Sequence, residues 1–219
     1  MEHSVSGVGV LDKALLVLSA LEVEPRSLSA LVSATGLTRA TAHRLASALE
    51  DHELVRRDDE GRFALGLRLV ALGRAAASGY PLAEAARPAL VALRDATGES
   101  VQLYVREDEV RVCVASLESP HGLRTIVPLG ARLTMDVGSA AKLLRGDPVE
   151  LKRGWAESVA EREAGVASVS APVFDTSGAV VAAVSVSGPI ERTTRTPGRQ
   201  YATAVREAAR RIETDAALR

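Results

Sequence analysis

The stretch SLSALVSATGLTRATAHRLASALEDHELVRRDDEGRFAL, residues 27–65, decides the fold of the N-terminal part of the chain. Leucines recur at the spacing of an amphipathic helix on both sides of residues 35–37. Gly36 can take a positive φ at the end of the first helix, and Thr38 is a good N-cap for the second. Leu37 is placed to fill the angle between them. This pattern predicts a helix-turn-helix.

A short hairpin follows the second helix. Residues 55–57 (VRR) and 62–65 (RFAL) flank the polar turn 58–61 (DDEG), which places Phe63 and Leu65 on one face. Two helices joined by a glycine turn also occur as an αα-hairpin inside a core, so the helices alone leave that alternative open. The added hairpin has the position of a wing and favours a winged helix-turn-helix that binds DNA.

Charge gives a mixed indication. The formal net charge of the chain is −1, and residues 1–79 hold nine lysines and arginines against ten acidic residues. A nonspecific nucleic-acid binder is usually more basic. Residues 38–48, however, include Arg39, His43 and Arg44 and no acid. A recognition helix presents such an end to DNA.

Composition limits the class of protein. With 219 residues, 47% hydrophobic and 25% charged, the chain has a globular composition and room for one or two domains. The longest nearly apolar run, 179–186, is too short to cross a bilayer, and the N-terminus lacks a signal-peptide pattern. We therefore expect a cytoplasmic protein without a membrane partner. The single cysteine, Cys113, has no partner for a disulfide or a zinc site, so neither a metal nor another cofactor is expected.

Helical patterns on both sides of the motif complete the N-terminal part. Leucines at 11, 15, 18 and 21 form one stripe, which predicts a helix packed under the helix-turn-helix. Residues 66–79 predict a linker helix, and Pro81 starts a further helix. The expected domains are a winged helix-turn-helix over 1–65, the linker helix over 66–79 and a second domain over 80–219.

In the second domain the hydrophobic period changes from helical to alternating. Strands are expected at 101–105, 110–114, 166–174 and 179–187, with 124–127 as a further candidate. Helices are expected from 138–144 and after Pro197 to the C-terminal end. This grouping predicts an α+β domain with an antiparallel sheet and helices packed around it.

Serines mark one face of this sheet. Ser168 and Ser170 point to the same side of their strand, and Ser185 and Ser187 do so on the next strand. Their neighbours are small, and hydroxyl groups can donate to a carboxylate or carbonyl of a ligand. A solvated sheet face would show the same pattern. Because parity does not tell which face is covered, both interpretations stay open.

Nothing in the chain favours an enzyme. None of the four histidines has a serine, cysteine or aspartate companion in the sequence. Glu157, Glu161 and Glu163 form a cluster of carboxylates, but such a cluster in a polar stretch is typical of a solvated face.

The chain resembles the IclR-type transcriptional regulators over nearly its whole length. The resemblance rests on VGVLDKALLVLSALE (8–22), GLTRATAHRLASALEDHELV (36–55), GRFALGLRLVALG (61–73) and, most specifically, GVASVSAPVFDTSGAVVAAVSVSGPIER (165–192). It implies a winged helix-turn-helix joined by a linker helix to a GAF-like effector-binding domain. The function it implies is a ligand-responsive regulator that acts as a homodimer or dimer of dimers on a pseudo-palindromic operator. The subgroup it resembles is associated with amino-acid metabolism, including leucine biosynthesis.

The resemblance also implies site residues. For double-stranded DNA these are Thr38, Arg39, Thr41, His43 and Arg44 in the recognition helix, and Arg56, Arg57 and Arg62 in the wing. For the effector they are Gly138, Ser139, Ser158, Ser168, Ser185 and Ser187. Similar regulators recognise small organic or aromatic acids, so the expected effector is a small organic acid or an amino-acid pathway metabolite. Few arginines or lysines lie near the serines in sequence to balance such an acid.

One segment departs from the family pattern. Only residues 145–153 separate the 138–144 helix from Gly154, where family members usually have a longer helical segment. Either part of a pocket wall is lost, or two segments are joined across a loop that the sequence does not show. The alternative function is a winged-helix module for protein assembly without sequence-specific DNA binding, which the low net charge fits better.

Overall fold

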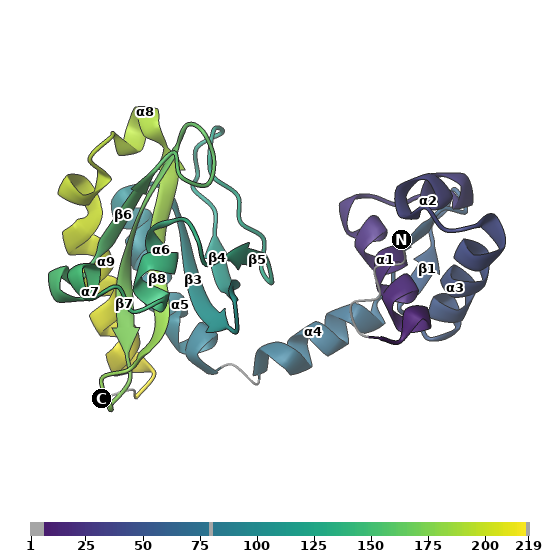
Figure 1. Cartoon of the computed structure of the whole chain (residues 1–219), viewed down its shortest axis with the longest axis horizontal. Coiled ribbons are helices and arrows are strands. Elements are labelled where there is room, and N and C mark those ends of the chain that lie inside the picture. The colour runs from purple at the N-terminus through teal and green to yellow at the C-terminus, as the bar shows by residue number, and fades with distance from the viewer. Residues whose placement is uncertain (1–6, 79–80, 218–219) are drawn as a thin grey trace. The chain divides into compact units, whose positions relative to one another are not determined.

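The computed structural model describes residues 7–78 and 81–217. By its internal contacts the chain divides into two units, Met1–Ser78 and Gly79–Arg219. Each is described by itself (Figure 1). No helix among the described residues is both long and apolar enough to cross a bilayer.

The N-terminal unit is a winged helix-turn-helix with a trailing helix. Its elements are α1 (Gly9–Val23), α2 (Leu28–Thr35), α3 (Arg39–Asp51), β1 (Val55–Arg57), β2 (Phe63–Leu65) and α4 (Arg68–Ser78). The two strands pair antiparallel, with Val55 opposite Leu65. Gly36 has φ 67° and its amide donates to the Val32 carbonyl, while the Thr38 hydroxyl accepts from the Thr41 amide at 3.3 Å. The predicted turn and N-cap are therefore present.

The core of this unit corrects the expectation for the first helix. Val17, Leu31 and Phe63 are fully buried, and together with Leu21 they hold the three helices against the hairpin. Leu11 and Leu15, which were expected to pack beneath the motif, are about half exposed. The helix is apolar on two faces, and the leucine spacing does not tell which of them meets the core.

The second unit places helices on both sides of a sheet. Its elements are α5 (Pro81–Thr97), β3 (Ser100–Glu107), β4 (Val110–Leu117), β5 (Arg132–Thr134), α6 (Ser139–Leu144), α7 (Pro148–Arg153), β6 (Ala156–Val159), β7 (Val166–Phe174), β8 (Val180–Pro189), α8 (Ile190–Thr193) and α9 (Pro197–Asp215). The strand order is β5-β4-β3-β8-β7-β6, and every pair is antiparallel. The α+β class is as predicted. The candidate strand at 124–127 was wrong, because these residues form a loop before β5.

The two faces of the sheet have different coverings. Val169, Val184 and Val186 pack with the long helices α5 and α9 in the larger core. On the opposite face the short helix α6 lies against β7 and β8, beside a smaller cluster that contains Tyr104 and Cys113. Figure 1 shows α6 on one side of the strands and the two long helices on the other. The serines of β7 and β8 face α6.

The short segment after α6 folds as a capped helix. The Asp147 carboxylate accepts from the amides of Val149 and Glu150 at 3.0 and 3.3 Å, and Pro148 takes the first helical turn. Gly154 ends α7 with φ 80°. The segment therefore has its own start and stop signals, and it supplies no residue to the cavity described below.

Candidate functional sites

A cavity lies between α6 and the serine face of the sheet. It is lined by Gln102, Tyr104, Arg111, Gly138, Ser139, Ala140, Ser158, Arg162, Glu163, Val166, Ser168, Ser185 and Ser187. All six residues expected at the effector site are in this set. The cavity volume is about 30 Å³, which leaves room for a ligand of only a few heavy atoms unless the walls move.

Strand register brings the serines together. Ser168 is opposite Ser187 in the β7–β8 pair, and Ser158 is opposite Ser168 in the β6–β7 pair. Ser185 and Ser187 are only 3% and 5% exposed. The face is therefore covered, and the alternative of a solvated sheet face was wrong.

A chain of hydroxyl groups ties α6 to the sheet. The Ser139 hydroxyl is 2.7 Å from the hydroxyls of both Ser168 and Ser170, and Ser170 donates to Ser185 at 3.0 Å. Ser170 does not line the cavity, but its hydroxyl links the lining residues Ser139 and Ser185. A ligand that hydrogen-bonds to Ser168 or Ser185 would therefore compete with bonds that fix the start of α6.

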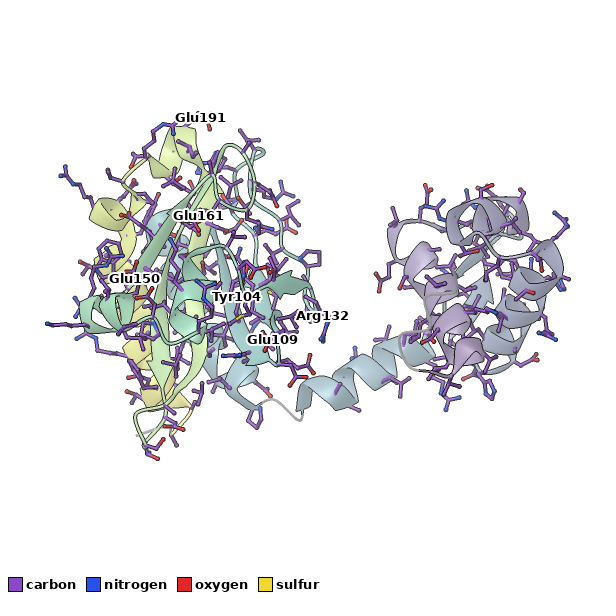
Figure 2. All side chains as sticks on the ribbon, viewed as in Figure 1. Tyr104, Glu109, Arg132, Glu150, Glu161 and Glu191 are labelled. Carbon is purple, nitrogen blue, oxygen red and sulfur yellow. The ribbon has the colours of Figure 1, made fainter. Side chains whose placement is uncertain are left out.

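Three lining residues on β3 and β4 were not anticipated. The Gln102 side chain accepts a hydrogen bond from the Ser187 hydroxyl at 3.0 Å, and its Nε2 is buried without a partner among the described residues. Tyr104 lies near the middle of the unit in Figure 2, where burial raises the pKa of its phenol. The Arg111 guanidinium lies 5.6 Å from the centre of the Tyr104 ring.

Arg111 corrects the expectation that cations are scarce near the serines. It is 3% exposed, and its Nη1 donates to the carbonyls of Thr134 and Val137. Burial lowers the pKa of Arg111. In the sequence, Arg111 alternates with valines, a pattern that is typical of a residue on the solvent-exposed side of a hairpin. Arg111 and Cys113 are buried while Val110, Val112 and Val114 are partly exposed, so the alternation does not tell which side of β4 is covered.

The carboxylates near the cavity have structural partners. Glu161 pairs with Lys142 at 2.6 Å and accepts from the Gly138 amide at 3.0 Å. Burial acts to raise the pKa of Glu161, but these hydrogen bonds outweigh it and the pKa lies below its usual value. Glu157 accepts from the Gly198 amide, and Glu163 pairs with Arg162 at 2.8 Å. The three glutamates do not converge on one point, as general acid and base groups would.

The outer face of α3 carries the residues expected to meet DNA. Arg39, His43 and Arg44 are exposed, and Thr41 is half-buried. The opposite face of the helix is buried through Ala42, Leu45, Ala46 and Leu49. Thr38 is exposed at the N-terminus, where its hydroxyl also bonds to that of Thr41. The acid-free end of the helix is thus the end open to solvent.

Two of the three wing arginines are held by their own domain. Arg57 bonds to Glu50 and to the Gly61 carbonyl at 3.4 and 2.9 Å, and it lies over the Phe63 ring. Arg62 pairs with acids of the wing turn, Asp58 at 2.8 Å and Glu60 at 3.1 Å. Arg56 is exposed and has no ion pair within residues 7–78 and 81–217. The three expected wing contacts are therefore not equivalent.

A winged helix-turn-helix in the same chain as a second domain with a polar cavity is the architecture of a DNA-binding regulator with a separate effector domain. The chain matches the IclR helix-turn-helix domain over residues 10–59, and the C-terminal domain of bacterial transcriptional regulator IclR over residues 74–146 and 150–214. It belongs to the IclR family. Members are transcriptional regulators, not enzymes. The gap at 147–149 falls in the shortened segment around α7.

Relatives and solved structures agree with this assignment. The glycerol operon regulatory protein of Streptomyces griseus is 28% identical over 86% of this chain and 87% of its own length. The Thermotoga maritima IclR structure is 23% identical, covers 95% of this chain and 98% of its own, and has a TM-score of 0.77. An IclR homologue from Microbacterium hydrocarbonoxydans complexed with 4-hydroxybenzoate is 22% identical, covers 95% and 99%, and has a TM-score of 0.78.

Proposed function

We propose that this protein is an effector-responsive transcriptional regulator that binds a pseudo-palindromic operator as a homo-oligomer. The observation that carries the proposal is the covered serine face, where a polar cavity lies in the same chain as a helix-turn-helix with an open cationic end. A buried polar cavity is costly to maintain, and a ligand that uses its donors offsets that cost.

In the DNA-binding step, α3 enters the major groove. Arg39 and Arg44 reach base edges or phosphates from its exposed face, and a bidentate arginine–guanine contact contributes about 1–3 kcal/mol of discrimination. Thr38 and the first amides of α3 face a phosphate, where the helix dipole is favourable. Arg56 is the wing residue best placed to contact the DNA backbone, because it makes no ion pair within the described residues 7–78.

A second copy of the chain is needed for tight binding. The formal net charge of −1 gives weak electrostatic attraction to DNA, so one head alone binds poorly. At the N-cap and along the first half of α1, an apolar stripe of Val8, Leu11 and Leu15 is 52%, 50% and 51% exposed. An exposed apolar stripe of this kind is favourable for pairing with an identical stripe, as two-fold operators require.

The effector acts by shifting populations. Ligand in the cavity binds the serines that hold the start of α6, and it binds more tightly to one arrangement of the oligomer than to the other. The linker helix α4 connects this change to the heads. The choice of target genes, with amino-acid biosynthesis as the candidate, remains a prediction that rests on the resemblance alone.

The experiment that tests the proposal maps the DNA bound in cells and then titrates the purified protein against the recovered site. Operator affinity should fall steeply with salt, because released counterions drive binding to DNA. The matched variants are Arg39→Ala on α3 and Arg74→Ala, an exposed arginine on α4. If no site is enriched, or if salt leaves the affinity unchanged, the protein is an assembly module instead.

A further inference from the structure

The effector cavity of about 30 Å³ admits a ligand of more than a few heavy atoms only if one of its walls moves. Most of these walls are fixed. The lining strands β3, β4, β7 and β8 each pair with two neighbours, and α6 packs Ala140 and Leu143 into the cluster that contains Cys113. The Ser139 hydroxyl also bonds the start of α6 to β7. The other lining residues lie on the edge strand β6 and in the loop that follows it.

The β6–β7 loop, residues 160–165, has few ties to the rest of its domain. It carries the lining residues Arg162 and Glu163, which bond to each other. It follows an edge strand that pairs with β7 over only four residues. At its ends, Ala160 and Gly165 have positive φ values of 56° and 84°. This conformation is unfavourable for alanine, so bonds elsewhere are needed to hold the loop in its shape.

Glu161 supplies such bonds. One of its carboxylate oxygens accepts from the Gly138 amide at 3.0 Å, and the other accepts from the Lys142 ammonium at 2.6 Å. Lys142 also donates to the Glu157 carbonyl on β6 at 2.8 Å. Among the described residues, Glu161 is the side chain of the loop that bonds to α6 (Figure 2). A single carboxylate thus joins the loop to both the start and the middle of this helix.

We propose that the β6–β7 loop is the movable wall of the effector cavity and that Glu161 is the latch that holds it closed against α6. This inference rests on the proposed function and adds how its effector site opens. When both Glu161 bonds break, the base of the loop between Ala160 and Val166 opens, and Arg162 and Glu163 leave the cavity. The other strands and α6 stay in place, so the serines keep the arrangement in which they meet the effector.

Amide hydrogen exchange on the full-length protein tests the latch without any ligand. The Ala160 amide donates to the Val166 carbonyl and the Val166 amide to the Glu163 carbonyl, so both are protected while the loop is closed. Glu161→Ala should speed exchange at these two amides roughly tenfold, because hydrogen bonds to a charged, partly exposed group are lost. Lys142→Met removes one of the two bonds and should have a smaller effect.

Glu163→Ala is the matched control for amide exchange. Glu163 lies on the same loop, but its carboxylate pairs with Arg162 and not with α6, so its loss should leave the exchange rates unchanged. Equal exchange in Glu161→Ala and the unmodified protein would overturn the proposal, and so would an equal acceleration in Glu163→Ala.

Side-chain oxidation shows whether the opening reaches the cavity. Tyr104 lines the cavity and is 5% exposed, so hydroxyl radicals should oxidise it several-fold faster in Glu161→Ala than in the unmodified protein. Tyr201, which is 4% exposed in the larger core, is the internal control. If oxidation of Tyr104 is unchanged, or if that of Tyr201 rises equally, the loop does not gate the cavity.

The reactivity of Cys113 distinguishes movement of the loop from movement of α6. Cys113 is the single cysteine of the chain, and it is fully buried with Ala140 and Leu143 of α6. A thiol reagent such as DTNB should react equally slowly with Glu161→Ala and the unmodified protein, because α6 stays on the sheet. A rise in Cys113 labelling that matches the rise in loop exchange would make α6 the moving wall and contradict the proposal.

These measurements use neither operator nor effector, so the latch and the proposed function can fail separately. A loop that stays closed in Glu161→Ala contradicts the latch while operator binding stands. A protein whose loop opens in this variant but which recognises no operator contradicts the proposed function and keeps the latch.

Discussion

Arg57 and Arg62 in the wing are each about 40% exposed and bond to acids of their own domain, whereas Arg111 in the second unit is 3% exposed and has no acid partner among the described residues. Exposed pairs gain little, because water already solvates both charges. A buried, unpaired guanidinium is the opposite case, since water is excluded and only an arriving anion can balance it.

This difference in burial and pairing shows that arginine has different roles in the two units. In the N-terminal unit, the paired arginines Arg57 and Arg62 shape the wing, whereas Arg39 and Arg44, which make no ion pair within residues 7–78 and 81–217, lie open to solvent on α3. In the second unit Arg111, which makes no ion pair among the described residues, is enclosed. An arginine without an acid partner among the described residues is available to an external anion, and on the exposed face of α3 we expect that anion to be a DNA phosphate.

The largest expected effect is on Arg39. Arg39→Ala should weaken operator binding roughly five- to a hundredfold, because it removes an exposed cation that contacts a base edge or phosphate. A mobility-shift titration at fixed salt measures the change, and Arg74→Ala is the control. Unchanged operator affinity would show that Arg39 does not contact DNA, and exposure without an ion pair would then not identify an anion-binding arginine.

Ser185→Leu should abolish stabilisation by the effector while operator binding is retained. Ser185 is 3% exposed and its hydroxyl accepts from Ser170, so a leucine fills the small cavity and breaks the hydroxyl chain. Overpacking of this kind costs about 1–3 kcal/mol of folding stability. Thermal shift with and without a panel of small organic acids, the expected effector class, is the measurement. Ser177→Leu, in the exposed β7–β8 turn, is the control. A surviving ligand response would place the effector elsewhere.

Sequence reasoning succeeded where the deciding signals are local. Gly36 and Thr38 mark the turn and the cap directly, so the helix-turn-helix could be predicted without knowledge of the rest of the fold. Alternation along β7 and β8 also placed their serines on one face. Which face of a helix or strand is covered depends on distant segments, and for that reason the predicted stripe of α1 was right at Leu18 and Leu21 and wrong at Leu11 and Leu15.

The cavity could be predicted only in part for the same reason. Its expected residues come from recognisable motifs, but Gln102 and Arg111 reach it through the pairing of β3 with β8 and β4. The strand β6, which brings in Ser158, was not predicted because AESV is short and lies next to a polar stretch. Arg111 in the alternating strand β4 would have been a signal for the cavity only if its side of the strand had been known to be buried.

Within the wing, Arg56→Ala and Arg57→Ala should have opposite signatures. Arg56 has no ion pair among the described residues, so its loss should reduce operator affinity several-fold, weaken the salt dependence by about one phosphate contact and leave the melting temperature unchanged. Arg57 packs over Phe63 at 3.7 Å, so its loss should lower the melting temperature and change affinity less. Equal losses of operator affinity in the two variants would mean that an arginine paired within the wing still contacts the phosphate backbone.

The smallest expected effect concerns the acid of a wing pair. The hydrogen bond from Arg62 holds the pKa of Asp58 below its ordinary value of 3.8. The folded protein therefore binds fewer protons at Asp58 than the unfolded chain does, and this contribution to stability is present above pH 3.8 and is lost as the pH falls further. The melting temperature of the unmodified protein should drop as the pH falls below 3.8, and that of Asp58→Asn should drop less. Glu60→Gln is the matched control, because Glu60 pairs with the same arginine from a more exposed position. Identical profiles for Asp58→Asn and the unmodified protein would show that Arg62 is not held by this acid in solution and is available to DNA.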